Sequence, residues 1–217
     1  IKALMRFNSK INPVPLKRLG AGYHSLDTGT KLASATGIRT AMANKDNISG
    51  LLPDNCLNII KNHTTIEYND FSTVLGSKLL SMDTLDHIEG INQDLSNRIA
   101  NNKYNFTDIE TFIPMLQSKN YTYSAISRAL LHIILDIKTD DIKEFVNNNY
   151  AMILGFTKKS GVLSEISKST KIPLVSKFAT FYKEADNNQR KMLDINLKAD
   201  NLYRMIYMLS LIHISEP

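Results

Sequence analysis

The residues whose types and spacing could do chemistry lie in one short string, SATGIR at residues 34–39. Its two hydroxyl residues, Ser34 and Thr36, stand where the spacing of Ile38 and Met42 predicts the start of a helix. Backbone N–H groups at a helix N-terminus can bind phosphate, hydroxyls can add hydrogen bonds, and Arg39 can neutralise charge. The string therefore predicts a phosphate site suited to a nucleotide. A plain helix cap that binds nothing is the alternative, because Ser and Thr cap many helices.

Residues that carry other kinds of chemistry are scattered. No histidine stands in an HxxxH, HxH or His/Cys ligand spacing, so the sequence predicts no metal site; the five are His24, His63, His87, His132 and His213. His132 lies in an apolar run and is expected to be a partly buried side chain. Cys56 has no basic neighbour to activate it, and as the single cysteine it indicates a reducing, cytosolic setting.

Charge is unevenly distributed along the 217 residues, whose net charge is +5. Residues 1–45 hold eight Lys and Arg against one acidic residue, residues 46–150 hold eight against fourteen, and residues 151–217 hold ten against six. Two basic ends thus flank an acidic middle. The pattern favours ends that meet phosphate, although such alternation also arises without any partner. No stretch approaches the roughly 18 consecutive apolar residues that a membrane span needs.

The elements that would position the SATGIR string and the basic residues are mostly helices. Over residues 50–150 successive apolar stretches have helical spacing, which predicts a helical bundle. The string TDIE at 107–110 has the pattern of a capping box ahead of one helix. After Tyr150 two glycines surround a basic turn, residues 172–175 read as a short strand, and residues 189–207 read as a final helix.

Four strings follow Lys17-Arg18 and Tyr23-His24 in order along the chain: LASATGIRTAM at 32–42, SNRIANNKYNFTDIETFIPMLQSKNYTYSAISRALLHIIL at 96–135, MILGFTKKSGVLSEI at 152–166 and IPLVSKF at 172–178. The ordered set resembles the tRNA(Met) cytidine acetate ligases, bacterial enzymes of the HIGH-type nucleotidyltransferase group. The resemblance runs through most of the chain, to about residue 203. Chance similarity over so long an ordered set is improbable.

The resemblance implies that acetate is activated with ATP to an acetyl-adenylate, with magnesium needed by the full enzyme. The acetyl group then passes to N4 of the wobble cytidine of elongator tRNA(Met). It also implies nucleotide-binding roles for Arg18, Ser34, Thr36 and Arg39, with Ser34 and Thr36 near phosphate oxygens and Arg39 near the leaving pyrophosphate. The candidates for contact with the tRNA backbone are Lys158, Lys159 and Lys177. The implied setting is cytoplasmic, without a membrane, and the oligomeric state is left open.

The chain departs from the family in one respect, because no His is followed by x-Gly-His and the family's catalytic HxGH motif is absent. We therefore expect no catalytic residue in this chain and no activity from it alone. The expected fold is mainly α: a remnant of an α/β nucleotidyltransferase domain at 1–48, a helical C-terminal domain with a short β/loop segment at 49–209, and a non-native tail at 210–217. Such a remnant should leave apolar surface around Leu4, Met5 and Val14 uncovered.

Two other classes of protein fit the sequence. One is a non-catalytic helical RNA-binding module that uses the basic ends and the tyrosines Tyr104, Tyr121 and Tyr123, since aromatic side chains stack on unpaired bases. Tyrosines at helix starts are, however, more often interface or core residues. The other is a helical domain whose partner is a protein, for which the residues offer nothing specific.

Overall fold

The structure is a computed structural model, and it describes residues 1–17, 19–20, 22, 25–29, 32–145, 149–157 and 161–214. It divides into two compact units, Ile1–Thr65 and Ile66–Pro217, which we describe separately. The sequence-based domain division after residue 48 stays a prediction, as does the separate tail at 210–217. Across residue 210 the backbone of the last helix continues without a break.

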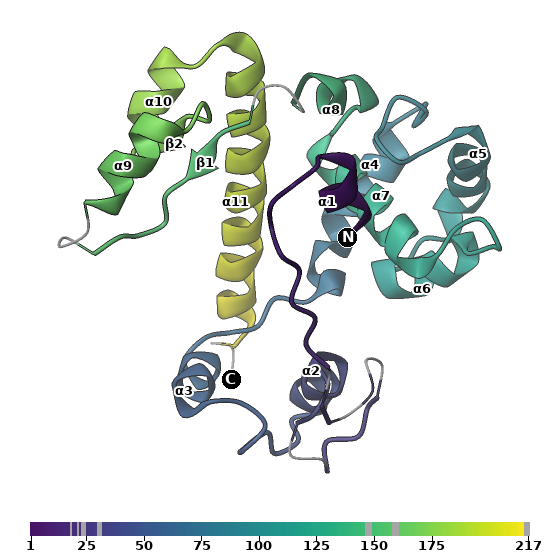
Figure 1. Ribbon diagram of the computed structural model, residues 1–217. Coiled ribbons are helices and arrows are strands. Elements are labelled where there is room, and N and C mark those ends of the chain that lie inside the picture. The colour runs from purple at the N-terminus through teal and green to yellow at the C-terminus, as the bar shows by residue number, and fades with distance from the viewer. Residues whose placement is uncertain are drawn as a thin grey trace. The chain divides into compact units, whose positions relative to one another are not determined.

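The described part of the first unit contains the helices α1 (Lys2–Arg6), α2 (Ala35–Ala43) and α3 (Asp54–Lys61) (Figure 1). Helix α3 begins after Pro53, with an acidic residue in its first turn and a basic one in its last, an arrangement that suits the helix dipole. In the described part of this unit there is no strand. Met5 and Val14 are each 76% exposed, in line with the expected uncovered apolar surface, whereas Leu4 is half-buried.

The second unit begins with a helical bundle. It consists of η1 (Tyr68–Phe71), α4 (Ser72–Ser81), α5 (Gln93–Asn102), η2 (Lys103–Asn105), α6 (Ile109–Leu116) and α7 (Tyr123–Leu135). The apolar stripes of these helices meet in one core, because residues three and four apart share a helix face. Its largest fully buried side chains are Leu75, Leu79, Ile88, Leu95, Ile99, Ile109, Phe112, Ile113, Leu116, Ile126, Leu130 and Ile133. The bundle predicted over residues 50–150 is confirmed for Tyr68–Leu135, whereas residues 50–65, with α3, belong to the first unit.

The start of α6 corrects one local prediction, because Asp108 and not Thr107 caps this helix. The Asp108 carboxylate accepts a hydrogen bond from the backbone N–H of Thr111 at 2.9 Å. The two free N–H groups before it are bound by the Ser72 hydroxyl at 3.1 Å and the Asn69 amide oxygen at 3.0 Å. Side chains from η1 and α4 thus complete the cap, which fixes α6 against them.

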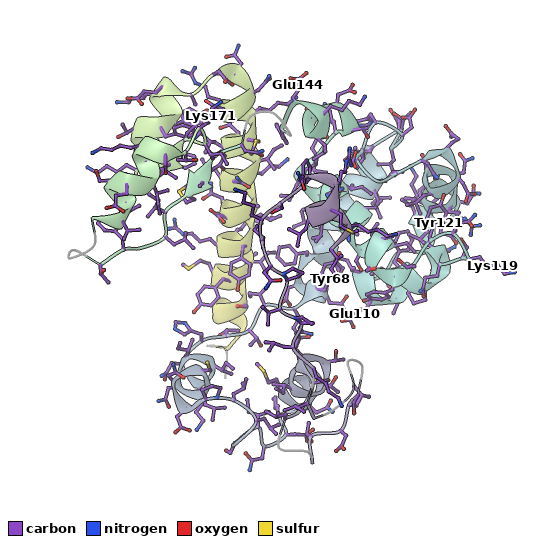
Figure 2. The ribbon with its side chains drawn as sticks, in the orientation of Figure 1. Tyr68, Glu110, Lys119, Tyr121, Glu144 and Lys171 are labelled. Carbon is purple, nitrogen blue, oxygen red and sulfur yellow. The ribbon has the colours of Figure 1, made fainter. Side chains whose placement is uncertain are left out.

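Tyr68, labelled in Figure 2, links η1 to α7, because its hydroxyl donates a hydrogen bond to the Ser127 carbonyl. Burial raises the pKa of this hydroxyl from 10.0 to about 12. The unfolded chain therefore releases this proton at a lower pH than the folded chain does. The stabilisation is complete below the unfolded pKa and is lost as the pH rises through the folded one.

We expect the Tyr68→Phe variant to lose less stability than the parent chain between about pH 9 and pH 12, by about 1 kcal/mol. The full equivalent of the pKa shift is larger, but the ring is partly exposed. Urea unfolding of both proteins across this pH range, followed by circular dichroism, measures the difference. Equal losses of stability with pH in the two proteins would show that ionisation of Tyr68 does not cause the loss.

The rest of the second unit holds α8 (Thr139–Phe145), β1 (Ala151–Met152), α9 (Val162–Ser169), β2 (Leu174–Val175), α10 (Phe178–Glu184) and α11 (Asn187–Ile214). The two strands pair in parallel, Ala151 opposite Leu174 and Met152 opposite Val175, with α9 between them in the chain. Parallel strands need such a crossover connection. A mainly α fold with a short β segment is confirmed, as are the expected strand near 172–175 and the final helix.

Helix α11 joins the two parts of the second unit, since it contacts α7, α8 and α10 (Figure 1). The ammonium of Lys191 pairs with the buried carboxylate of Asp141 on α8, which also accepts the backbone N–H of Lys138 at 3.1 Å. Lys198 donates to the Leu135 carbonyl at the end of α7 at 2.8 Å, where a cation complements the helix dipole. Burial, with a smaller contribution from a nearby lysine, lowers the pKa of Lys198.

Candidate phosphate site at the start of helix α2

Ser34 forms the N-terminal cap of α2, as its position in the SATGIR string predicts. Its hydroxyl accepts a hydrogen bond from the Gly37 N–H at 2.9 Å and donates one to the Ser25 carbonyl at 2.5 Å. The side chain is fully buried. Its single proton is thus engaged within the protein, and Ser34 holds the turn in shape. Direct contact between Ser34 and a phosphate stays a prediction.

Gly37 allows the segment before the helix to lie close against α2. A β-carbon at this position would stand 3.1 Å from the Ser25 carbonyl oxygen and 3.3 Å from that of Leu26. Both distances are tighter than ordinary van der Waals contact, and the atoms in the way belong to the backbone. The glycine of the string is therefore required by close packing of the Ser25–Leu26 backbone on the first turn of α2.

The polar groups that remain available to a ligand lie in the first turn of α2. The N–H groups of Ala35 and Thr36 lie in the first turn, where the helix itself provides no acceptor, whereas those of Gly37 and Ile38 bond to Ser34. Thr36 is half-buried and Arg39 is exposed. Two aligned N–H groups, a hydroxyl and a guanidinium can together bind the oxygens of a phosphate.

Of the other four predicted ligand contacts, the structure describes only Lys177. Arg18, Lys158 and Lys159 lie outside the described residues. Lys177 is described: it is exposed and directly precedes the first residue of α10, in the second unit. The structure therefore assembles Ser34, Thr36 and Arg39 into one local site. The phosphate-binding and RNA-binding roles of all these residues stay predictions.

The three tyrosines of the RNA-binding alternative have different environments. Tyr121, labelled in Figure 2, packs against the bundle core. It donates its hydroxyl hydrogen to the Asn92 side chain at 2.5 Å, and the Arg98 guanidinium lies 6.0 Å from the centre of its ring. It therefore has a structural role at the start of α5. Tyr123 is 47% exposed and Tyr104 is 79% exposed, and the latter has the Lys103 ammonium 5.4 Å from its ring centre.

The structure contains a pocket that the sequence did not predict. It lies between the end of β1, the start of α10 and the middle of α11, and its volume is about 710 Å³. We call it the α11 pocket; it is lined by Tyr150, Met152, Phe178, Met192, Asn196, Leu197, Ala199 and Asp200. These residues come from segments far apart in the chain, so no local spacing could have indicated it.

Side chains that could ligate a metal ion are dispersed over the part of the chain that the structure describes. These residues contain no group of three or more His, Cys, Asp or Glu that could hold a metal ion. His132 is half-buried, and its Nδ1 lies 2.7 Å from the Glu89 carbonyl oxygen, which gives this ring the structural place expected of it. Among the described helices, none is long and apolar enough to cross a membrane.

Comparison with known proteins gives the family. The model of the HIGH Nucleotidyl Transferase family matches residues 1–214, and the chain belongs to this family. A tRNA(Met) cytidine acetate ligase of Caldanaerobacter subterraneus is 32% identical over 215 residues, 95% of this chain and 53% of the relative. One of Thermoanaerobacter sp. (strain X514) is 30% identical with the same coverage. The resemblance to these ligases is thus confirmed, and the chain spans about half the length of the curated relatives.

Solved structures show the same fold. The apo form of Thermotoga maritima TmcAL matches with a TM-score of 0.82 and 22% identity, over 94% of this chain and 53% of that one. The same protein bound with alpha-thio ATP matches with a TM-score of 0.79. The likeness to these structures shows a shared fold.

Proposed function

We propose that this chain is part of an ATP-dependent ligase that forms N4-acetylcytidine at the wobble position of elongator tRNA(Met). An acetate oxygen attacks the α-phosphorus of ATP, which releases pyrophosphate and forms acetyl-adenylate. The cytidine N4 then attacks the acetyl carbon, AMP leaves, and N4 gives up a proton. The observation that supports the proposal is the capped first turn of α2, with its unbonded N–H groups, inside a chain similar to ligases of this name.

In this proposal the chain's own residues hold the nucleotide. The N–H groups of Ala35 and Thr36 and the Thr36 hydroxyl bind phosphate oxygens, and Arg39 stabilises the charge that builds on the leaving pyrophosphate. Ser34 keeps the turn in position through its two hydrogen bonds. Magnesium, which the full enzyme is expected to need, would neutralise charge on the ATP phosphates.

The remaining functions are assigned by the same proposal. The exposed Lys177, with Lys158 and Lys159, contacts the tRNA backbone by charge alone. No His of the sequence is followed by x-Gly-His, so the histidines that act in adenylation are not among its residues. We therefore expect the 217 residues alone to show no acetate-dependent exchange between ATP and pyrophosphate. In this proposal the reaction takes place in the cytoplasm, together with its tRNA partner.

A chimera tests the proposed function. This chain replaces the matching half of the Caldanaerobacter subterraneus ligase, and the product is incubated with ATP, acetate and tRNA(Met). We expect N4-acetylcytidine, detected by mass spectrometry of the digested tRNA, and none when acetate is omitted. The unaltered relative is the positive control. A folded chimera that binds the tRNA without acetylating it would favour the non-catalytic RNA-binding module instead.

A further inference from the structure

The walls of the α11 pocket include aromatic and thioether side chains, and its two aromatic rings each pack against another ring of α10. The Phe178 ring stacks on Tyr182, with 5.8 Å between the ring centres and 23° between the planes. The Tyr150 ring lies 5.6 Å from that of Phe181, at 48°. Met152 and Met192, with Leu197 and Ala199, complete the apolar lining. Flat, polarisable walls of this kind favour a flat, polarisable ligand.

The support behind Phe178 is itself fixed by polar contacts. Tyr182 donates its hydroxyl hydrogen to Asp194 on α11 at 2.8 Å, and the Arg190 guanidinium lies 5.9 Å from the centre of the same ring. Arg190 also donates through Nε to the Tyr182 carbonyl at 3.1 Å. The α10 wall of the pocket is thus anchored to α11 at several points, so little order has to be gained when a ligand enters.

One side of the α11 pocket is polar. Asn196 and Asp200 stand one turn apart on α11, and the Asn196 amide donates to the Tyr150 hydroxyl. That amide keeps a second N–H and its oxygen, while the Asp200 carboxylate accepts only. A carboxylate beside an amide matches a base that carries an exocyclic amine next to a ring acceptor, as cytosine and adenine do and uracil does not.

Basic side chains are placed next to this pocket in the chain. Lys177 directly precedes Phe178, and Arg204 follows Asp200 by one helical turn. Both are exposed, and neither has an ion pair within the described residues. Aromatic walls with cations at the margin are what single-stranded nucleic acid binds: bases stack, and phosphates meet Lys and Arg.

We propose that the α11 pocket binds one unpaired cytosine or adenine of the RNA partner. The base stacks on Phe178, and its exocyclic amine donates to Asp200 while Asn196 donates to the adjacent ring nitrogen. The pocket positions the RNA and takes no part in the acetyl transfer. This inference rests on the proposed function for the nature of the partner, since RNA is the nucleic acid that the family's ligases modify.

The test uses the full 217-residue chain and three short RNA oligomers, oligo(C), oligo(A) and oligo(U), with binding followed by fluorescence anisotropy. We expect oligo(C) and oligo(A) to bind about 10-fold more tightly than oligo(U). In Phe178→Ala the loss of stacking should weaken oligo(C) binding by about 10-fold. Asp200→Asn, a change at an exposed position, should remove the preference and leave oligo(U) binding unchanged.

Controls separate this proposal from general RNA affinity. Phe7→Ala removes an aromatic ring that is 76% exposed and does not line the pocket, and it should alter none of the three affinities. Equal affinities for the three oligomers, or a preference that survives Asp200→Asn, would overturn the proposal. An active chimera whose tRNA binding is insensitive to both pocket variants would remove the pocket's role and keep the proposed function. A clear base preference with an inactive chimera would keep the pocket's role and contradict the proposed function.

Discussion

Phe112→Ala should lower the free energy of unfolding of the second unit by about 3–5 kcal/mol, the usual range for removing a buried aromatic ring. Phe112 is fully buried on α6, and the edge of one ring meets the face of the other where it contacts Phe106, with 5.1 Å between the ring centres and 82° between the planes. The substitution removes this contact and leaves a cavity among helices that are pinned to each other by side-chain caps. Those helices can therefore close the cavity only in part.

Urea unfolding followed by circular dichroism measures this effect. The matched control is Met115→Ala on the same helix, where the side chain is 48% exposed and the loss should stay within about 1 kcal/mol. A similar loss in both variants would mean that α6 does not present Phe112 to the core. Tryptophan fluorescence is not an option, since the chain has no tryptophan.

Arg39→Ala in the chimera should reduce the rate of acetyl-adenylate formation by about 10²- to 10³-fold, the effect of removing one group that stabilises transition-state charge. Arg39 is exposed and lies one turn from the free N–H groups of Ala35 and Thr36. Its guanidinium contributes to no ion pair in the described part of the chain, so its removal should leave stability unchanged. The rate is read from acetate-dependent exchange of labelled pyrophosphate into ATP.

Two further variants sharpen the Arg39 result. Arg39→Lys keeps the charge but loses the forked donors and should recover only part of the rate. Lys61→Ala removes an exposed cation at the end of α3 in the same unit and should change nothing. If Lys61→Ala and Arg39→Ala slow the reaction equally, the contribution is general electrostatics and the role assigned to Arg39 is wrong.

The sequence predicted those features of the fold that depend on neighbouring residues. Helical spacing predicted a bundle over residues 50–150, and it was sufficient for the helices between Tyr68 and Leu135, because each apolar stripe is local to its own helix. The cap of α6 was misplaced by one residue, since Thr107 and Asp108 are both good caps and the choice between them depends on Asn69 and Ser72, far back in the chain.

The local features of the candidate site could be predicted from the sequence, whereas its contacts with distant residues could not. The cap at Ser34 follows from the SATGIR string, but its hydrogen bond to Ser25, nine residues earlier, could not be read from it. The α11 pocket left no signal at all, because β1, α10 and α11 come together only through tertiary packing. Residues such as Asn196 and Asp200 look like ordinary surface positions until the opposite wall is known.

The contact of Gly37 with the Ser25–Leu26 backbone has a consequence for how this region can change during evolution. Ser34 needs the Ser25 carbonyl within reach, and that carbonyl is within reach because position 37 has no side chain. A substitution at 37 that displaces the segment also deprives Ser34 of its acceptor, so a later change at 34 does little further harm. Substitutions at the two positions should therefore be epistatic, and the order in which they are acquired decides which intermediates survive.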